Sequence, residues 1–206
     1  VEDSRSGMIE RRLLDSGIKA IAGVDEAGRG ACAGPLVVAA LILKNPNNSS
    51  LLQVRDSKLL SPIQRENLYP LILDQASAHA IIEIPSEEID TRGLHKSNIE
   101  GMRRAVNALG LTPDYVLTDG YEIPGMPYPN LAVWKGDQVA LTISAASIIA
   151  KVYRDRLMIE LDKKYPGYGL AEHKGYVTKA HSDAMKRLGV SPIHRKSYAN
   201  VTKLIK

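Results

Sequence analysis

The stretch Ile21-Ala22-Gly23-Val24-Asp25-Glu26-Ala27-Gly28-Arg29-Gly30 combines a short apolar strand, two adjacent carboxylates and a glycine-rich turn. The apolar run 36–43 (LVVAALIL) follows it, bounded by Gly34-Pro35 and by a turn that begins at Asn45-Pro46. A continuous apolar run of this length between turn residues is typical of a buried strand. The two segments therefore predict two strands joined through a glycine-containing loop.

Strand-like and helix-like segments alternate along the rest of the chain. Further strands are predicted over residues 79–84, 115–118 and 131–134, and helices over 8–19, from Ser61 onward, and over 97–109, 144–165 and 178–188. Ser61-Pro62-Ile63-Gln64 is a capping box with proline at the first helical position, and Pro70 is expected to kink or end that helix. This order predicts a single α/β domain over 1–206, with a core over about 20–165 and a helical part over 166–206.

Charge is distributed unevenly. Residues 1–150 hold 14 Lys and Arg against 18 Asp and Glu, whereas residues 151–206 hold 13 against 5 and three of the five histidines. A basic C-terminal quarter on a mildly acidic body indicates a polyanionic partner, although a solvated helical surface explains it equally well. With nine Tyr, one Trp and no Phe, the chain is poorly supplied with the stacking platforms of single-strand binders.

Composition excludes several classes of protein. One cysteine, Cys32, rules out an internal disulfide framework and a multi-cysteine zinc site, and it is expected to be a small buried residue. The longest uncharged apolar stretch, 31–43, is shorter than the ~17–25 residues of a membrane helix. Residues 1–5 lack the apolar core of a signal peptide. We expect a cytoplasmic, monomeric protein with no membrane association.

Three predicted strands end in carboxylates, namely Asp25-Glu26, Asp119 and Asp137, each beside a glycine. Strand ends of open α/β sheets are where ligands bind. Four carboxylates without clustered Cys or His form a hard-oxygen ligand set suited to Mg²⁺ or Mn²⁺. The alternative is that each acid merely caps a turn, which is common for Asp next to Gly.

The stretch Gly28-Arg29-Gly30-Ala31-Cys32-Ala33 formally matches the dinucleotide-binding fingerprint G-x-G-x-x-G/A. Its context contradicts that reading, because a strand follows it and the acid expected about 20 residues further on is absent. A glycine-flanked arginine suits close approach of backbone N–H groups to a sugar or phosphate. A plain tight turn is the alternative.

Polar residues elsewhere offer contacts for a phosphate backbone. Ser144, Ser147, Lys151 and Arg154 share one face of the long predicted helix. A solvated polar stripe is the simpler interpretation of that face. Further candidates lie in loops, and they are Lys58 and the group His173, Lys174 and Tyr176. Tyr176 is alternatively a half-buried structural aromatic.

Taken together, six motifs in order resemble bacterial ribonuclease HII over residues of about 20–200. The motifs are Gly23–Gly30, Asp56-Ser57-Lys58, Asp119-Gly120, Lys135-Gly136-Asp137, Ser144–Lys151 with Arg154-Asp155, and His173–Tyr176. The resemblance implies a ribonuclease H-like fold, with a mixed central sheet flanked by helices and a helical, basic C-terminal region. The presence of Gly-Arg-Gly, and the roughly 20 residues before the first predicted strand, favour ribonuclease HII over the related ribonuclease HIII.

The resemblance also implies an activity. Members of that family cut the RNA strand of RNA–DNA hybrids, including on the 5′ side of a single ribonucleotide in duplex DNA, and leave 3′-hydroxyl and 5′-phosphate ends. The family's metal-binding acids correspond to Asp25, Glu26, Asp119 and Asp137, with Mg²⁺ or Mn²⁺ as cofactor. Its Gly-Arg-Gly loop contacts the 2′-hydroxyl and nearby phosphates, and its tyrosine, here Tyr176, stacks on the sugar after the ribonucleotide. Tyr121 departs from the usual Asn.

Three other functions stay open at this point. A non-catalytic duplex-binding module would share the basic surface but would not need four carboxylates. A dinucleotide-dependent oxidoreductase would share the glycine loop, although it lacks the expected acid. A structure-selective DNA nuclease of the same fold would cut duplexes that contain no ribonucleotide.

Overall fold

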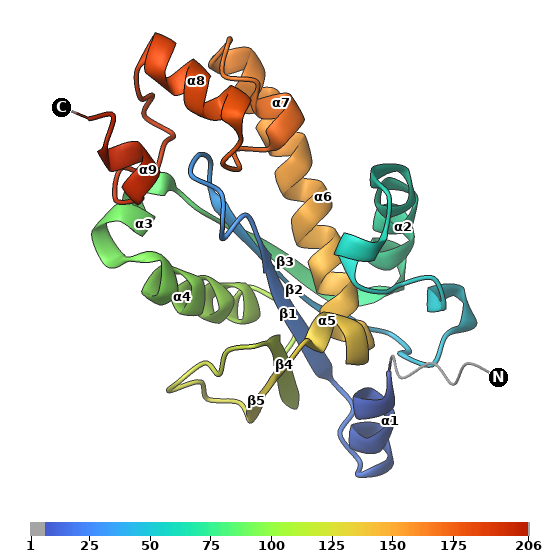
Figure 1. Cartoon of the computed structure of the whole chain (residues 1–206). Helices are drawn as coiled ribbons and strands as arrows, with labels where there is room; N and C mark the ends of the chain where they lie inside the picture. Colours follow the sequence, from blue (N-terminus) through green and yellow to red (C-terminus); the bar gives the residue numbers. More distant parts are fainter. Residues whose placement is uncertain (1–6, 206) are drawn as a thin grey trace.

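The computed structural model describes residues 7–205, so the expectation for residues 1–5 lies outside the described residues. Its centre is a five-stranded sheet in the order β3-β2-β1-β4-β5 (Figure 1). The strands are β1 (Ile21–Ala27), β2 (Leu36–Leu43), β3 (Ala76–Ile84), β4 (Tyr115–Asp119) and β5 (Asn130–Val133). The pairs β1–β2 and β2–β3 are antiparallel, whereas β1–β4 and β4–β5 are parallel. The predicted α/β class with a mixed sheet is confirmed.

Helices surround this sheet and dominate the last third of the chain. They are α1 (Met8–Asp15), α2 (Pro62–Gln75), α3 (Ser86–Arg92), α4 (Leu94–Asn107), α5 (Gly136–Val139), α6 (Leu141–Lys164), α7 (Leu170–His173), α8 (Lys179–Leu188) and α9 (Ala199–Thr202), with 3₁₀ turns η1 (Ser49–Leu51) and η2 (Ser57–Leu59). Each predicted strand and helix is present. The sequence analysis missed α3, α5, α7 and α9, which are too short to show a helical period.

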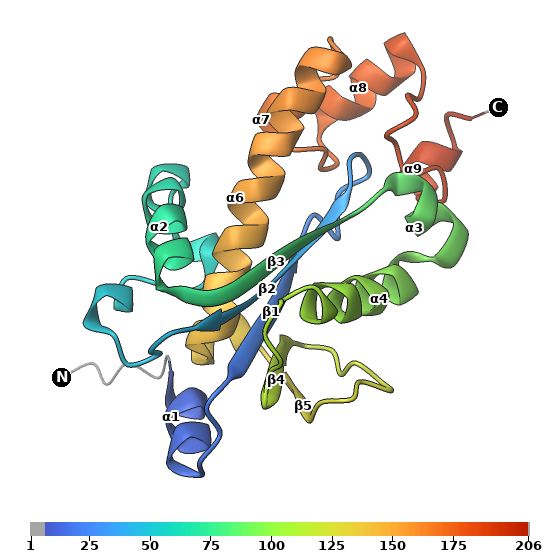
Figure 2. The same cartoon turned by 180° about the vertical axis from the view of Figure 1, so that it is seen from behind.

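The sheet is buried on both faces, which explains why β2 is apolar throughout. Val37, Ala39 and Leu41 pack with residues of α2 and α6 on one face. The alternate residues of β2, such as Val38 and Ala40, pack with α4 on the other. Figures 1 and 2 show α6 crossing one face of the sheet and α4 covering the opposite one. The result is a three-layer α/β/α arrangement.

Helix α6 crosses β1 at unusually short range. A Cβ at Gly23 would lie 2.2 Å from the carbonyl carbon of Thr142, so only glycine fits there. The start of α6 is held by buried Glu10 of α1, whose Oε1 accepts hydrogen bonds from the Thr142 amide and hydroxyl, both at 2.8 Å. A carboxylate at a helix N-terminus satisfies free N–H groups and favours the helix dipole.

Pro70 does not end α2, which was one of the two predicted outcomes, because α2 continues to Gln75. The capping box at Ser61 and Gln64 is present. Proline removes one helical hydrogen bond and leaves the carbonyl four residues earlier without a donor. Pro70 and Glu66 both lie on the exposed side of α2, so water can satisfy that carbonyl.

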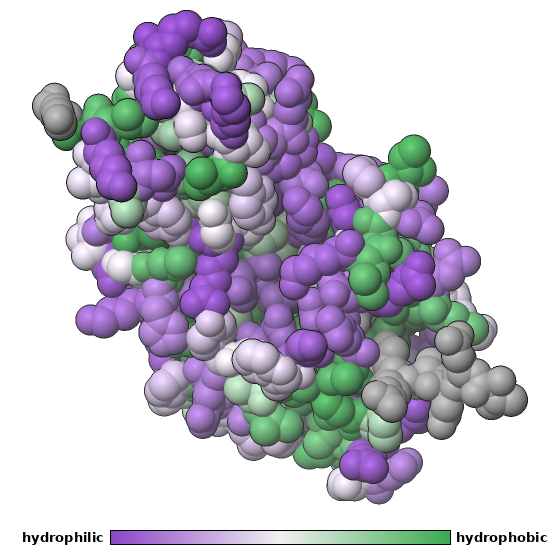
Figure 3. All heavy atoms as spheres, in the orientation of Figure 1, coloured by the Kyte–Doolittle hydropathy of each residue, from purple (hydrophilic) through white to green (hydrophobic). Residues whose placement is uncertain are grey.

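The basic C-terminal part packs against the far end of α6 and on the loop after β1. In Figure 1 it forms the upper region, and Figure 3 shows that its surface on this side is mostly hydrophilic. Cys32 is fully buried in this region, as predicted, and burial raises the pKa of its thiol. Among residues 7–205, no helix is both long and apolar enough to cross a membrane.

Candidate active site

Three of the predicted acids converge at one end of the sheet. Two of them lie on the neighbouring parallel strands β1 and β4. Val24 pairs with Thr118 across the parallel β1–β4 ladder, so Asp25 and Asp119 follow side by side at the same end of the sheet. Asp137 reaches the same point from α5, directly after β5. One carboxylate oxygen from each of Asp25, Asp119 and Asp137 lies within 4.8 Å of the others. We call these three residues the acidic cluster.

Short hydrogen bonds fix the loop that carries Asp137. The Gly136 amide donates to Oδ1 of Asp119 at 2.7 Å, and the Ser144 hydroxyl donates to the Asp137 carbonyl at 2.7 Å. Lys58, in η2, places its ammonium 3.1 Å from Oδ2 of Asp137. The side chain of Lys58 is 78% exposed, so its charge is available to a ligand as well as to Asp137. Although partial burial opposes it, the hydrogen bond to Asp137 raises the pKa of Lys58.

Glu26 follows Asp25 in the strand and therefore projects from the opposite face of the sheet, toward α4. It lies outside the group of three acids that share the 4.8 Å limit. Its Oε2 is buried and has no hydrogen-bond partner, and neither polar atom of the neighbouring buried Asn98 has one. A buried carboxylate oxygen without a donor is costly in the free protein and is suited to a cation.

Electrostatics in this region favour a bound positive charge. Burial, together with the charges of Glu26 and Asp119, raises the pKa of Asp25 well above its usual range. Burial also raises the pKa of Glu26 to about 7, against the opposing effects of Asn98 and Arg29. Burial raises the pKa of Asp137 despite the nearby Lys58. Like charges forced together in a low dielectric resist ionisation, and a divalent cation removes that resistance.

These residues fit a divalent metal ion by their chemistry. The donors are carboxylate oxygens, which Mg²⁺ and Mn²⁺ prefer, and no His or Cys belongs to the cluster. Asp25 and Asp137 are only 5% and 3% exposed, so their negative charge is poorly compensated by water. Asp25, Asp119 and Asp137, with Glu26 beside them, are thus the residues that would hold metal.

The glycine-rich loop and the Tyr176 loop meet beside this cluster. A Cβ at Gly30 would lie 3.7 Å from Cε1 of Tyr176, so the ring packs against the turn. The amides of Cys32 and Ala33 donate to the Gly175 carbonyl at 2.9 and 3.3 Å. Gly28 has φ +89°, and a side chain there would strike Arg154. Two motifs about 145 residues apart in the sequence therefore form one surface.

Arg29 is held by Tyr121, the residue that departs from the family pattern. Its Nη1 donates to the Tyr121 hydroxyl, and its guanidinium carbon lies 4.5 Å from the centre of the Tyr121 ring. His95 packs edge-on against the same ring, with the two centres 5.3 Å apart. A cation over an aromatic face is attracted by the ring quadrupole. Tyr121 thus replaces a small amide by a platform that orients Arg29.

The predicted phosphate-binding stripe on α6 is wrong for three of its four residues. Ser144, Ser147 and Arg154 are 0%, 3% and 0% exposed. The hydroxyls of both serines donate to backbone carbonyls, and Arg154 donates to the carbonyls of Ala33, Pro35 and Lys174. The shared face was identified correctly, but it points to the sheet and the C-terminal part.

Lys151 is the member of that stripe that reaches solvent. Its side chain is 24% exposed, it pairs with Asp155 at 2.7 Å, and its ammonium lies 5.9 Å from the Tyr176 ring centre. His173 and Lys174 use their polar groups inside the loop instead. The ring nitrogens of His173 contact the Tyr168 carbonyl and the Gly175 amide, and Lys174 Nζ donates to the Ala171 carbonyl. These hydrogen bonds shape the Tyr176 loop, and the contact of His173 and Lys174 with substrate stays a prediction.

Two further histidines, missed by the sequence analysis, support Tyr176 from behind. The Ser191 amide can only donate, so Nδ1 of His194 accepts from it at 3.1 Å and Nε2 of His194 carries the proton. That proton points to Nε2 of His181 at 3.1 Å, which leaves Nδ1 of His181 to donate to the Tyr176 carbonyl at 2.9 Å. Burial, and then the charge of His181, lowers the pKa of His194 to about 4. Both rings are therefore neutral at neutral pH.

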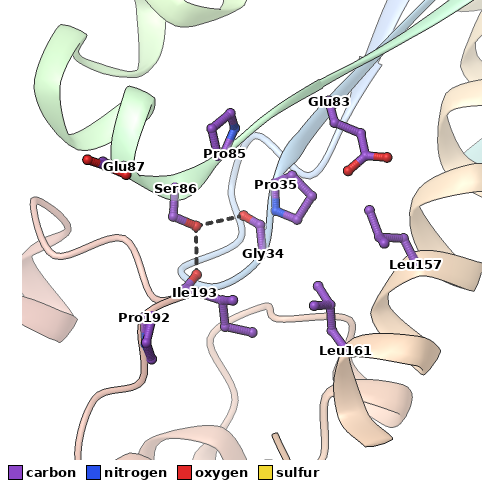
Figure 4. A pocket seen from close by; sticks show the side chains of 10 residues that line it. All are labelled: Gly34, Pro35, Glu83, Pro85, Ser86, Glu87, Leu157, Leu161, Pro192 and Ile193. Atoms are coloured by element: carbon purple, nitrogen blue, oxygen red, sulfur yellow. Dashed lines mark hydrogen bonds between the residues drawn. The ribbon is translucent and has the colours of Figure 1, made fainter. Parts of the chain in front are cut away.

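A pocket of about 460 Å³ lies outside the acidic cluster (Figure 4). Leu157 and Leu161 of α6 face Pro35 and Ile193 across it, and the Ser86 hydroxyl donates to the carbonyls of Gly34 and Ile193. None of the cluster acids lines this pocket. The carboxylates suited to a metal ion therefore lie outside this cavity.

A mixed sheet of this topology, with three carboxylates gathered at one end, fits the class that the motif resemblance implies, namely metal-dependent nucleases with a ribonuclease H-like fold. Comparison with known proteins narrows the class. The family model for ribonuclease HII matches residues 22–201. The chain belongs to the ribonuclease HII family, a family of metal-dependent endoribonucleases.

Individual relatives agree with that assignment. The chain is 53% identical to the ribonuclease HII of Salinispora tropica over 193 residues, which are 94% of this chain and 72% of that relative. It is 55% identical to the ribonuclease HII of Mycobacterium tuberculosis over 196 residues, covering 95% of this chain and 74% of that relative. Both of these relatives are bacterial proteins, as the motif resemblance implied.

Solved structures support the fold. The ribonuclease H2 of Pyrococcus horikoshii superposes with a TM-score of 0.78 at 31% identity, over 90% of this chain and 96% of that one. Bst-RNase HIII in complex with Mn²⁺ superposes with a TM-score of 0.69 over 90% of this chain and 69% of that one, and at 19% identity it bears on the fold alone. The predicted ribonuclease H-like fold is confirmed.

Proposed function

We propose that this chain cuts the RNA strand of RNA–DNA hybrids and the 5′ side of single ribonucleotides embedded in duplex DNA, leaving 3′-hydroxyl and 5′-phosphate ends. The observation that carries the proposal is the placement of the acidic cluster next to the joined Gly28–Gly30 and Tyr176 loops. A metal-dependent nuclease needs the acidic cluster, and recognition of a ribose needs the joined loops. The proposed role is removal of ribonucleotides and RNA primers from DNA.

Divalent ions, two of Mg²⁺ or Mn²⁺ in our proposal, would activate water and stabilise the leaving 3′-oxygen. Asp25, Asp119, Asp137 and Glu26 would hold them. The protein contributes mainly position and charge, as is general for phosphoryl transfer. Burial of Asp25 and Asp137 aligns their carboxylates before substrate arrives. Lys58 and Gly136 keep Asp137 and Asp119 in register, because they donate directly to these carboxylates.

Discrimination between RNA and DNA would come from the loops. The 2′-hydroxyl is the group by which a protein distinguishes the two at one nucleotide. Arg29, which Tyr121 orients, and the N–H groups of the Gly28–Gly30 turn would contact that hydroxyl and its neighbouring phosphate. The Tyr176 ring is 37% exposed, which leaves one side available to pack on the following sugar. Lys151 and the basic C-terminal part would add affinity that does not depend on sequence.

One assay tests the proposal. Three labelled duplexes are incubated with the enzyme in Mg²⁺, in Mn²⁺ and in EDTA: a DNA duplex with one ribonucleotide, an all-DNA duplex of the same sequence, and a long RNA–DNA hybrid. We expect metal-dependent cuts at the ribonucleotide and within the hybrid, and none in the all-DNA duplex. Equal cutting of the all-DNA duplex would instead identify a structure-selective DNA nuclease.

A further inference from the structure

Trp134 is the sole tryptophan of the chain and lies immediately after β5. Its residue is 82% exposed, more than any other large apolar residue in the described part of the chain. Exposed indoles are unfavourable in water, and Trp is concentrated at surfaces that bind. Neither the acidic cluster nor the core accounts for this side chain.

The backbone around Trp134 is fixed relative to the acidic cluster. On one side, the Gly120 amide donates to the Val133 carbonyl at 3.0 Å, and Val133 pairs with Asp119 in the β4–β5 ladder. On the other side, Lys135 adopts a left-handed conformation with φ 53°, and Gly136 donates to Asp119. The segment Val133–Asp137 is therefore a tight turn anchored at both ends to a cluster residue. The backbone that carries the indole is thus fixed next to the acidic cluster and does not belong to a free loop.

Two cations accompany the indole at this rim. Lys135 is its exposed neighbour in sequence, and within residues 7–205 it makes no ion pair. Lys58 reaches Asp137 from the adjoining η2 turn. Within the same residues, Trp134 makes no side-chain hydrogen bond and contacts no aromatic partner. An exposed indole followed by an exposed lysine, three residues from the cluster carboxylate of Asp137, suits a nucleic-acid strand, which offers planar bases and sugars together with phosphates.

We propose that Trp134 is a substrate-contacting residue whose indole packs on a base or sugar of the bound duplex, next to the nucleotide at the acidic cluster. The inference rests on the proposed function, because it requires a nucleic acid over these acids. A phosphodiester at Asp119 and Asp137 lies against the Val133–Asp137 turn, so its neighbouring nucleotides pass over the exposed indole. Stacking on an aromatic side chain is tolerant of sequence, and its loss weakens binding about five- to hundred-fold.

The sole tryptophan makes the test direct. The Asp119→Asn variant of this chain is used because the substitution is expected to prevent turnover. It is titrated in Mg²⁺ with an unlabelled duplex carrying one ribonucleotide while tryptophan emission is recorded. Anisotropy of a labelled copy of the duplex measures binding separately. We expect emission to change and to saturate at the same concentration as the anisotropy. Binding by anisotropy with unchanged emission would overturn the proposal and leave the proposed function intact.

Variants separate a contact from a structural role. Trp134→Leu in the active enzyme should raise KM at least about fivefold with little change in kcat, and Trp134→Phe should recover most of the affinity. Leu111→Ala is the matched control, since Leu111 is 45% exposed and precedes β4, at the opposite end from Asp119. If Trp134→Leu behaves like that control, Trp134 does not touch substrate. If neither the wild-type protein nor any variant binds or cuts any duplex, the proposed function itself fails.

Discussion

Replacing Glu26 by glutamine should make the metal-free protein more stable at neutral and alkaline pH, although Glu26 belongs to the site. Burial raises the pKa of Glu26 from 4.5 to about 7. Between these two values the folded protein binds the proton more tightly than the unfolded chain, so stability falls as the pH rises through this window. Each pKa unit corresponds to about 1.4 kcal/mol, which makes the full cost of ionising Glu26 about 3 kcal/mol. Glutamine has the same shape and does not ionise.

The assay is urea denaturation in EDTA, followed by circular dichroism, at several values between pH 5 and 8. The quantity of interest is the unfolding free energy of Glu26→Gln minus that of the wild type. We expect this difference to grow by about 2–3 kcal/mol from pH 5 to pH 8. Burial lowers the pKa values of His181 and His194, which costs stability as the pH falls below about 6.5. That effect is common to both proteins and cancels in the difference.

A control variant, and the effect of Mg²⁺ on which protein is more stable, make the prediction specific to Glu26. Glu122 is an exposed carboxylate, so Glu122→Gln should give a difference that is nearly constant with pH. Saturating Mg²⁺ should reverse the order at pH 8, because binding to the folded wild type adds stability that the glutamine variant cannot gain fully. A pH-independent difference for Glu26→Gln in EDTA would refute the reasoning that burial of this carboxyl strains the metal-free fold.

Further variants test the metal site, the Tyr176 loop and the two cations Lys151 and Arg154 of α6. Asp119→Asn should abolish cleavage in saturating Mg²⁺ with an unchanged circular dichroism spectrum, and turnover at the wild-type rate would remove Asp119 from the mechanism. Tyr176→Ala should lower kcat/KM about ten- to hundred-fold at a single embedded ribonucleotide, a larger loss than within a long hybrid. Tyr176→Phe should keep most of the activity. Equal losses in the Ala and Phe variants would assign the effect to the hydroxyl. Arg154→Met should lower the unfolding free energy in urea denaturation by at least about 3 kcal/mol, because three buried carbonyls lose their donor. Lys151→Ala should reduce the salt dependence of hybrid binding by about one phosphate contact. The reverse pattern would place Arg154 at the surface.

The elements that carry chemistry were predictable because their signals are local. The apolar run of β2, the capping box of α2 and the carboxylates beside glycines are each visible within about ten residues. Convergence of Asp25, Asp119 and Asp137 followed from the rule that adjacent strand ends share one edge of the sheet. A helix end at Pro70 was not required, because the cost of a missing hydrogen bond depends on exposure, which the sequence does not show.

The orientation of α6 was the main failure of sequence reasoning. Helical spacing correctly placed Ser144, Ser147 and Arg154 on one face, but spacing alone does not say what that face meets. Charged and hydroxyl side chains suggested solvent. The structure instead buries Ser144 and Ser147 with their hydroxyls on nearby backbone carbonyls, and Arg154 among carbonyls of segments that are distant in sequence. Trp134 and the His181–His194 pair were missed for a related reason, because exposure and side-chain pairing arise only from the tertiary fold.

The buried arginines have a consequence for the order in which this enzyme acquires its activity during synthesis. Arg195 donates to the carbonyls of Arg29 and Gly34, and the Cys32 carbonyl accepts from the Arg195 amide. These contacts join positions more than 160 residues apart, so they are among the last that a growing polypeptide can form. The turn proposed to recognise the ribose stays incomplete until translation has passed Arg195. All residues of the acidic cluster have been synthesised by position 137, so the turn proposed to recognise the ribose is the later of the two parts of the site to be completed.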